Sequence, residues 1–342
     1  MSKGKLTVVI SQAPGKNPAK RALEENLAAS LLMEPGIELS IIPHLYDLGP
    51  DHTGRLFLES IPGDMVVLAW LFPRAGFWLL DRDGIRGTEG QSPLHPIAEK
   101  DDEDSDEPPP EKAPGIGPLG EVPDRTIWCL DLRDHAGHQI YLEEIRRIRA
   151  EAALLREGRQ AAKQATRPPA VITLGLPTQK KPTPEFTPET LLAPSNRRWY
   201  PVIDYSRCTN CMECLDFCLF GVYGVDGLDR ILVENQDSCK KGCPACSRVC
   251  PEQAIIFPDY KSAAIAGAPV GNIGGLKIDL SKLFGGEDQM VVAAQERDRE
   301  LVKDGRDAVG LAVGIPKRQS DKPKGPRDEL DSLVDALDNL DI

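Results

Sequence analysis

The sequence predicts a three-layer α/β domain in residues 1–160, followed by a small cysteine-rich α+β domain. Three observations support this prediction. Short apolar runs alternate with amphipathic helical patterns over the first part of the chain, as in a sheet covered by helices. Two proline-rich stretches then interrupt the pattern. All but one of the 9 cysteines lie between Cys208 and Cys250, which sets this part of the chain apart.

Hydrophobic periodicity predicts the elements of the α/β domain. Apolar, partly β-branched runs predict four strands, at Leu6 to Ile10, Ile37 to Leu45, Met65 to Phe72 and Thr126 to Leu132. Helical spacing predicts helices over 19–33, 55–60 and 141–160, the last with a buried stripe of Leu142, Ile145, Ile148 and Leu154. The continuous apolarity of the third strand favours a parallel sheet, in a Rossmann-like or flavodoxin-like architecture with right-handed crossovers.

Three further segments complete the predicted organisation. Residues ~98–123 are acidic and proline-rich, which predicts a disordered insert, and residues 161–196 predict a semi-extended proline-rich linker. The cysteine domain and its extension are expected in 197–286, and a helical or flexible acidic tail in 287–342. The last fifteen residues place leucines and a valine on one face, so a helix there either caps the protein's own surface or enters a partner's groove.

Charge and composition limit the function. The 53 acidic and 41 basic side chains give a net charge of -12, which repels nucleic acid and favours partner proteins with basic docking surfaces. The first apolar run is too short for a signal peptide or a membrane span. We therefore expect a cytoplasmic protein, without nucleic-acid binding, in which clustered cysteines bind metal and do not form disulfides.

The cysteine spacing indicates which metal is bound. Cys208, Cys211, Cys214 and Cys218 follow the pattern C-x2-C-x2-C-x3-C, and Cys239, Cys243, Cys246 and Cys250 repeat it with one extra residue in the first gap. This run, with its flanking strand-like stretches, resembles the dicluster bacterial-type ferredoxin domain over residues ~199–259. Two departures are Leu219, where that family usually has proline, and the longer gap at Lys240 to Gly242.

The resemblance implies two 4Fe-4S clusters, with the fourth cysteine of each run bound to the other run's cluster. Three cysteines on a tight loop can hold three corners of a cubane, whereas the fourth is expected at the start of a helix that points away. Cluster I is then bound by Cys208, Cys211, Cys214 and Cys250, and cluster II by Cys239, Cys243, Cys246 and Cys218. A pair of zinc sites is the main alternative, although zinc modules usually separate two C-x2-C pairs by a long spacer.

Residues near the ligands should tune the clusters. Eight aliphatic side chains are expected to wall them off, namely Val202, Ile203, Val222, Val225, Ile231, Val233, Ile255 and Ile256. Loop amides should donate hydrogen bonds to the sulfurs. We expect both clusters to have low reduction potentials. Lys240 and Lys241 would favour the reduced state of cluster II.

The sequence supports candidate sites in the α/β domain less strongly than it supports the cysteine site. Gly15, Lys16 and Asn17 occupy a loop that could bind an anion, although a simple turn fits equally well. His135 and His138 could contribute to a metal site but lack further ligands. Cys129 is expected in the core, and Arg74, at the end of the third strand, could face an anionic substrate.

These observations predict an electron-transfer iron-sulfur protein that shuttles single electrons between redox partners. An alternative is the electron-input subunit of an oxidoreductase whose α/β domain binds a substrate or cofactor. A third reading makes the clusters structural or sensory. No catalytic residues are assigned by the sequence.

Overall fold

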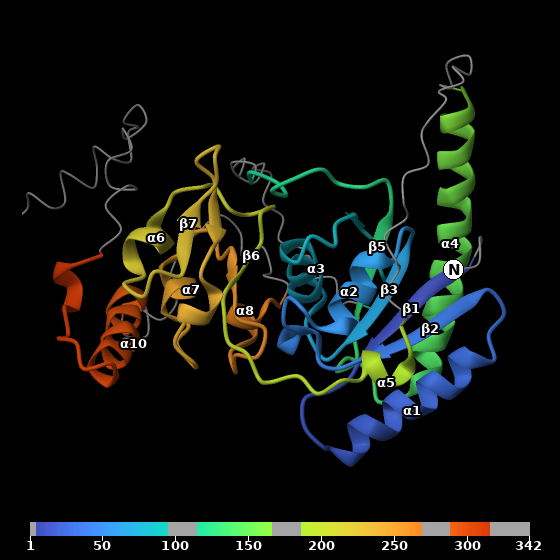
Figure 1. Cartoon of the computed structure of the whole chain (residues 1–342), viewed down its shortest axis with the longest axis horizontal. Helices are drawn as coiled ribbons and strands as arrows, with labels where there is room; N and C mark the ends of the chain where they lie inside the picture. Colours follow the sequence, from blue (N-terminus) through green and yellow to red (C-terminus); the bar gives the residue numbers. More distant parts are fainter. Residues whose placement is uncertain (1–4, 95–114, 166–185, 269–287, 315–342) are drawn as a thin grey trace, which may run out of the picture.

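A computed structural model describes residues 5–94, 115–165, 186–268 and 288–314, and Figure 1 shows their arrangement. The first part is a Rossmann-like α/β domain, whose 5-stranded parallel sheet has the order β2-β1-β3-β5-β4. Its strands are β1 (Leu6–Ser11), β2 (Ile37–Ile42), β3 (Met65–Ala69), β4 (Thr88–Glu89) and β5 (Thr126–Asp131). Its helices are α1 (Pro18–Leu32), α2 (Thr53–Ser60), α3 (Pro73–Arg82) and α4 (His138–Ala165).

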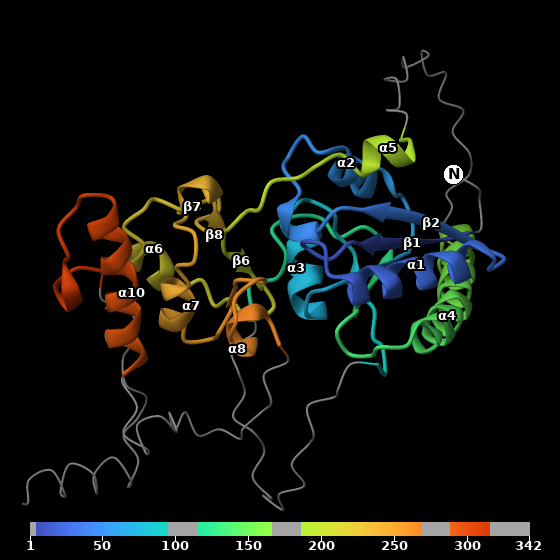
Figure 2. The same ribbon diagram turned by 90° about the horizontal axis from the view of Figure 1, so that it is seen from below.

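The central strands β1, β3 and β5 are buried on both faces, which confirms the three-layer prediction. Alternate side chains of one strand point in opposite directions. Val8 and Ile10 of β1 therefore join the core under α1 and α4, whereas Val9 joins the core under α2 and α3. Figures 1 and 2 show these helices on the two sides of the sheet.

Several predicted boundaries are wrong. The run at 65–72 is not a single strand, because β3 ends at Ala69 and Pro73 begins α3, which the sequence analysis missed together with β4. Proline is well suited to a first helical turn, where its missing N–H has no partner to lose. The strand expected over 37–45 ends at Ile42. In α4, Leu154 is 69% exposed and Ala152 is buried in its place.

The cysteine region contains short elements. Helix α5 (Pro188–Leu191) precedes strand β6 (Val202–Ile203), which pairs antiparallel with β9 (Ile255–Ile256). Strands β7 (Tyr223–Val225) and β8 (Ile231–Val233) form a hairpin. The helices of this region are α6 (Glu213–Phe217), α7 (Ala245–Val249) and α8 (Ala263–Ala266), and helix α10 (Gln289–Lys303) follows it. Among the described residues, the 3-10 turns are η1 (Leu45–Asp47) in the α/β domain, η2 (Gln236–Ser238) in the cysteine region and η3 (Gly310–Ala312) after α10. The helical pattern predicted after residue 287 is therefore confirmed as α10.

The two regions share one core, which the predicted linker did not anticipate. The hydrophobic cluster under α2 and α3 continues into the cysteine region. The Tyr46 hydroxyl donates to the carbonyl of Tyr200 at 2.5 Å and accepts from its N–H at 2.8 Å. Arg74 does not face a substrate; its Nε lies 2.5 Å from the Asp204 carboxylate, which is 2% exposed. Figure 2 shows the cysteine region beside α3.

The ends of both predicted flexible segments are also packed. Residues 95–114, 166–185 and 315–342 lie outside the described residues, and with them most of the acidic insert, most of the linker and the predicted terminal helix. At the end of the insert, however, the N–H of Ile116 donates to the carbonyl of Cys208. At the end of the linker, the Phe186 ring packs edge-on against Phe57. Composition alone therefore predicted too much flexibility for both segments, because their last residues pack against the rest of the protein.

Candidate functional site: two cavities lined by cysteine thiols

The eight clustered cysteines line two separate cavities, four in each. The first cavity is lined by Cys208, Cys211 and Cys214 from the first run and by Cys250 from the second. Apolar side chains form much of its remaining wall, namely Ile203, Met212, Ile231, Ala254 and Ile255.

The second cavity has the reciprocal composition. Cys239, Cys243 and Cys246 come from the second run, and Cys218 comes from the first. Its wall includes Phe217, Phe220, Val222, Tyr223, Ala245, Lys240 and Arg297. Each cavity therefore takes its fourth thiol from the other run, which is the grouping that the sequence resemblance implied. That these thiols bind iron remains a prediction.

Loop conformation directs backbone amides toward the sulfurs. Asn210 and Met212 adopt left-handed φ angles of 58° and 64°, and Gly242 does so at 88° where the second run has its extra residue. Glycine adopts this conformation without strain and Asn tolerates it, and successive turns of this kind group N–H donors on one side of a loop. The Asn210 side chain fixes the first loop by accepting from the N–H of Ile231 at 2.8 Å.

Hydrogen bonds reach sulfurs in both cavities. The N–H of Ala254 donates to Cys250 Sγ at 3.3 Å, and the Tyr223 hydroxyl donates to Cys246 Sγ at 3.1 Å. Cys218 also accepts hydrogen bonds from the amides of Phe220 and Val222. Such donors stabilise negative charge on a thiolate or on a sulfur-ligated metal group. Sequence analysis predicted amide donors but missed the Tyr223 hydroxyl.

Burial makes free thiolates unfavourable in both cavities. The pKa of Cys208 and that of Cys243 are raised to about 11, mainly by burial and also by neighbouring thiols, with a backbone amide acting in the opposite direction. Burial likewise raises the pKa of Cys214 and Cys246 well above the ordinary value. Four thiolates in one cavity therefore require a compensating positive charge, which bound metal supplies.

The predicted aliphatic wall is largely present. Val202, Ile203, Val222, Ile231, Ile255 and Ile256 are buried. Val233 is only partly buried, and Val225 is 49% exposed, so Val225 does not shield a cavity. Within the described residues, no three His, Cys, Asp or Glu side chains converge on a point where one metal ion would bind.

Cations beside the second cavity differ from the expectation. Lys241 is exposed, and the Lys240 ammonium forms an ion pair with Asp304 at 2.6 Å, which offsets its charge. The buried cation in the cavity wall is Arg297 of α10, which the sequence analysis missed. The sequence pattern could have indicated that Arg297 is buried, because it lies on the helix face that also carries Ala293, Ala294 and Leu301.

The α/β candidates do not form a site together. Asn17 caps α1 by accepting from the N–H groups of Ala19 and Lys20, so the loop of Gly15 and Lys16 is a turn. Cys129 is buried, as expected. The N–H of His135 donates to the Tyr141 hydroxyl, whereas the His138 ring contacts Gln139.

The usual ligand position of such a fold is occupied by side chains of the protein. Ligands of doubly wound folds bind beyond the carboxyl ends of the strands, where the strand order reverses. Here the buried Glu24 carboxylate lies beyond β1 and β3 and accepts from the N–H of Ala13 at 2.6 Å and from Trp70 Nε1 at 2.8 Å. The Arg21 guanidinium forms an ion pair with this carboxylate at 2.7 Å, so these side chains partner one another at that place.

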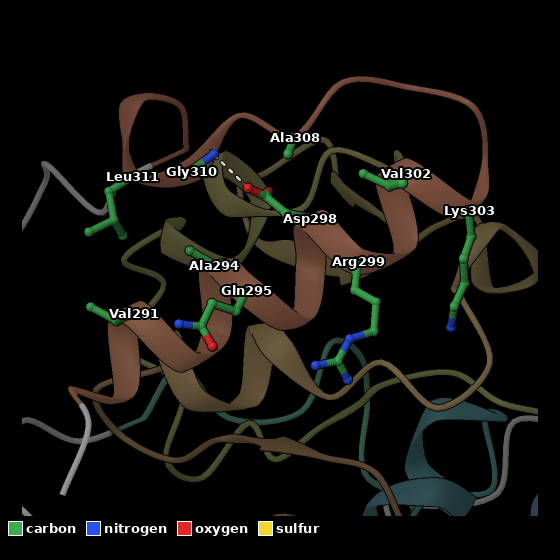
Figure 3. A pocket seen from close by; sticks show the side chains of 10 residues that line it. All are labelled: Val291, Ala294, Gln295, Asp298, Arg299, Val302, Lys303, Ala308, Gly310 and Leu311. Carbon is green, nitrogen blue, oxygen red and sulfur yellow. Dashed lines mark hydrogen bonds between the residues drawn. The ribbon is translucent and has the colours of Figure 1, made fainter.

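A third cavity lies on the outer side of α10 and is open to solvent (Figure 3). Its volume is about 550 Å³, and it is lined by residues of α10 and of the segment that ends at η3. Asp298 accepts from the N–H of Gly310 at 2.5 Å and joins these two walls. No cysteine lines it, so this groove is separate from the thiol cavities.

Comparison with protein-family models, curated proteins and solved structures finds no match. None of the described helices is both long and apolar enough to cross a membrane.

Proposed function

We propose that residues ~199–259 form a dicluster ferredoxin-type domain and that the protein carries single electrons between redox partners. The observation that supports this most directly is the division of eight thiols into two cavities, each with three thiols from one run and one from the other. A 4Fe-4S cluster, when bound, accepts or donates one electron. Four thiols in a largely apolar cavity are a suitable ligand set for it.

The residues of the chain would bind and insulate the clusters. Cys208, Cys211, Cys214 and Cys250 would hold cluster I, and Cys239, Cys243, Cys246 and Cys218 would hold cluster II. Amides and the Tyr223 hydroxyl stabilise the sulfur charge. The apolar walls exclude water, which favours the less charged oxidised state and a low reduction potential.

Metal and sulfide analysis tests this proposal. Protein expressed and purified anaerobically should contain about eight iron atoms and eight acid-labile sulfides per chain, as two 4Fe-4S clusters require. The matched control is Cys129→Ala, which removes a buried thiol outside both cavities and should leave the iron content unchanged. Colourless protein that binds zinc in place of iron would refute the proposal.

The proposed partners have basic docking surfaces, because the chain carries a net charge of -12. Under anaerobic conditions, the reduced protein should reduce a basic c-type cytochrome faster at low salt than at physiological salt, since salt screens the attraction between them. An acidic electron acceptor serves as the control and should show the opposite salt dependence. Equal salt dependence for both acceptors would contradict electrostatic docking.

The α/β domain is proposed to support the cysteine region and its docking rather than to bind a nucleotide. Tyr46 and Arg74 contact the cysteine region directly, and Glu24 occupies the usual ligand position. Copurification of a flavin or nucleotide with the full-length protein would instead favour the oxidoreductase subunit.

A further inference from the structure

Helix α10 places a charged side chain against the second thiol cavity. Arg297 is 1% exposed, and it lies in the wall of the cavity that contains Cys218, Cys239, Cys243 and Cys246. It comes from outside the cysteine region, on a helix that packs against α7. A buried arginine is rare because removal of its charge from water is costly, so its surroundings must be arranged to hold it.

Mostly neutral groups hold this guanidinium. Its centre lies 4.5 Å from the centroid of the Phe217 ring. Nη1 donates to the carbonyl of Val313 at 2.9 Å, and Nη2 donates to the carbonyl of Gly310 at 2.6 Å. Nε donates to the carboxylate of Asp298 at 3.1 Å. The carbonyls and the aromatic ring satisfy the donors without cancelling the positive charge, and the Asp298 carboxylate offsets that charge in part.

The charged groups at the two cavities differ. The lining of the first includes Glu252, and Arg207 lies near its thiol Cys250. The lining of the second includes Arg297 and the paired Lys240, and Glu296 and Glu300 lie near its thiol Cys243. Charges interact strongly where water is excluded. A cluster becomes more negative by one unit when it takes up one electron, with no bond formed or broken. A nearby cation stabilises that state, whereas a nearby anion destabilises it.

We propose that the buried charge of Arg297 raises the reduction potential of cluster II. This inference rests on the proposed binding of two clusters and extends it to a residue that sets the potential of one of them. Arg297 acts as a tuning residue through its charge, since it is not a ligand. The proposal predicts opposite effects for Arg297 and for its carboxylate partner Asp298.

The test is an anaerobic redox titration followed by electron paramagnetic resonance, with dithionite as the reductant. Arg297→Gln should lower the ratio of reduced to oxidised cluster II at a fixed potential on the order of tenfold, which is about 59 mV for one electron. Asp298→Asn should shift the same cluster in the opposite direction. Arg297→Lys keeps the charge and should restore most of the wild-type potential. The signal of cluster I should move little in all three variants.

Arg299→Gln is the matched control, because Arg299 is an exposed residue of the same helix, near the outer groove (Figure 3). It should leave both potentials unchanged. An Arg297→Gln protein with full iron content and an unchanged cluster II potential would overturn the inference, as would equal shifts for Arg297→Gln and Arg299→Gln. Absence of iron from the wild-type protein would instead refute the proposed function. If only the Arg297→Gln protein loses its iron, the Asp298→Asn protein becomes the deciding test. An unchanged cluster II potential in Asp298→Asn would then also overturn the inference.

Discussion

At the scale of single residues, the exchange of the fourth cysteine is the feature with the clearest chemical consequence. The sequence analysis was wrong to expect each fourth cysteine at the start of a helix, because Cys218 directly follows the end of α6 and Cys250 that of α7. Each short helix thereby carries the last thiol of its run away from the loop that precedes it. Cys250 thereby reaches the cavity of the first run, and Cys218 reaches that of the second. A substitution in one run should therefore affect the cluster held mainly by the other.

Cys250→Ala should reduce the iron content by roughly half and remove the signal of cluster I, because this thiol lines the first cavity. Cys218→Ala should remove the signal of cluster II instead. Iron analysis with low-temperature electron paramagnetic resonance distinguishes the two. Loss of cluster II from Cys250→Ala would show that each run binds its own cluster.

At the scale of elements, the segment that ends the acidic insert covers the first cysteine loop. The N–H of Gly117 donates to the carbonyl of Tyr205, beside the bond from Ile116 to Cys208. A side chain at Gly115 would lie about 2.3 Å from the backbone of Ser206, so only glycine fits this close approach. The segment is thus a specific cover for the loop that carries Cys208.

Gly115→Ala should displace this cover and speed the loss of cluster I iron to a chelator severalfold, because local opening exposes the loop. The matched control is Gly63→Ala, since an added Cβ there meets no atom within 4 Å. Iron release is followed by absorbance under anaerobic conditions. Equal release from the two variants would show that the segment does not protect the cluster.

The sequence predicts elements well where periodicity acts alone and poorly where packing decides. The apolar runs at Leu6 and Thr126 become β1 and β5 almost unchanged. By contrast, the apolar run from Met65 does not reveal where β3 ends and α3 begins, because a buried strand and a buried helix are equally apolar. The covering role of Ile116 depends on distant backbone groups, which composition cannot reveal. The thiol grouping follows from local spacing, whereas Arg297 enters from a helix beyond the cysteines.

At the scale of the whole molecule, the two regions are joined by buried polar contacts as well as by the shared core. Arg74 also donates to the carbonyl of Gln253 at 2.7 Å, next to its ion pair with Asp204. The Asp204 carboxylate further accepts from the N–H of Ser206 at 3.0 Å. A buried charge that loses its partner is costly, so this contact should couple the stability of the two regions.

Arg74→Ala should lower the free energy of unfolding by about 3 kcal/mol, because it leaves the buried Asp204 carboxylate without its cation. Anaerobic urea unfolding, followed by tryptophan fluorescence, measures the change. The control is Arg146→Ala, whose ion pair with Glu34 lies on the surface and should contribute little. Similar losses in both variants would argue against a tight interface.

The place of Arg297 in the chain also bears on how the protein matures during synthesis. The residues that line the first cavity have all left the ribosome once Ile255 has emerged, whereas the second cavity lacks part of its wall until α10 follows. Domains fold as their residues emerge, amino end first. Metal loading of the nascent chain is thus expected to begin at the Cys208 loop and to finish beside α10.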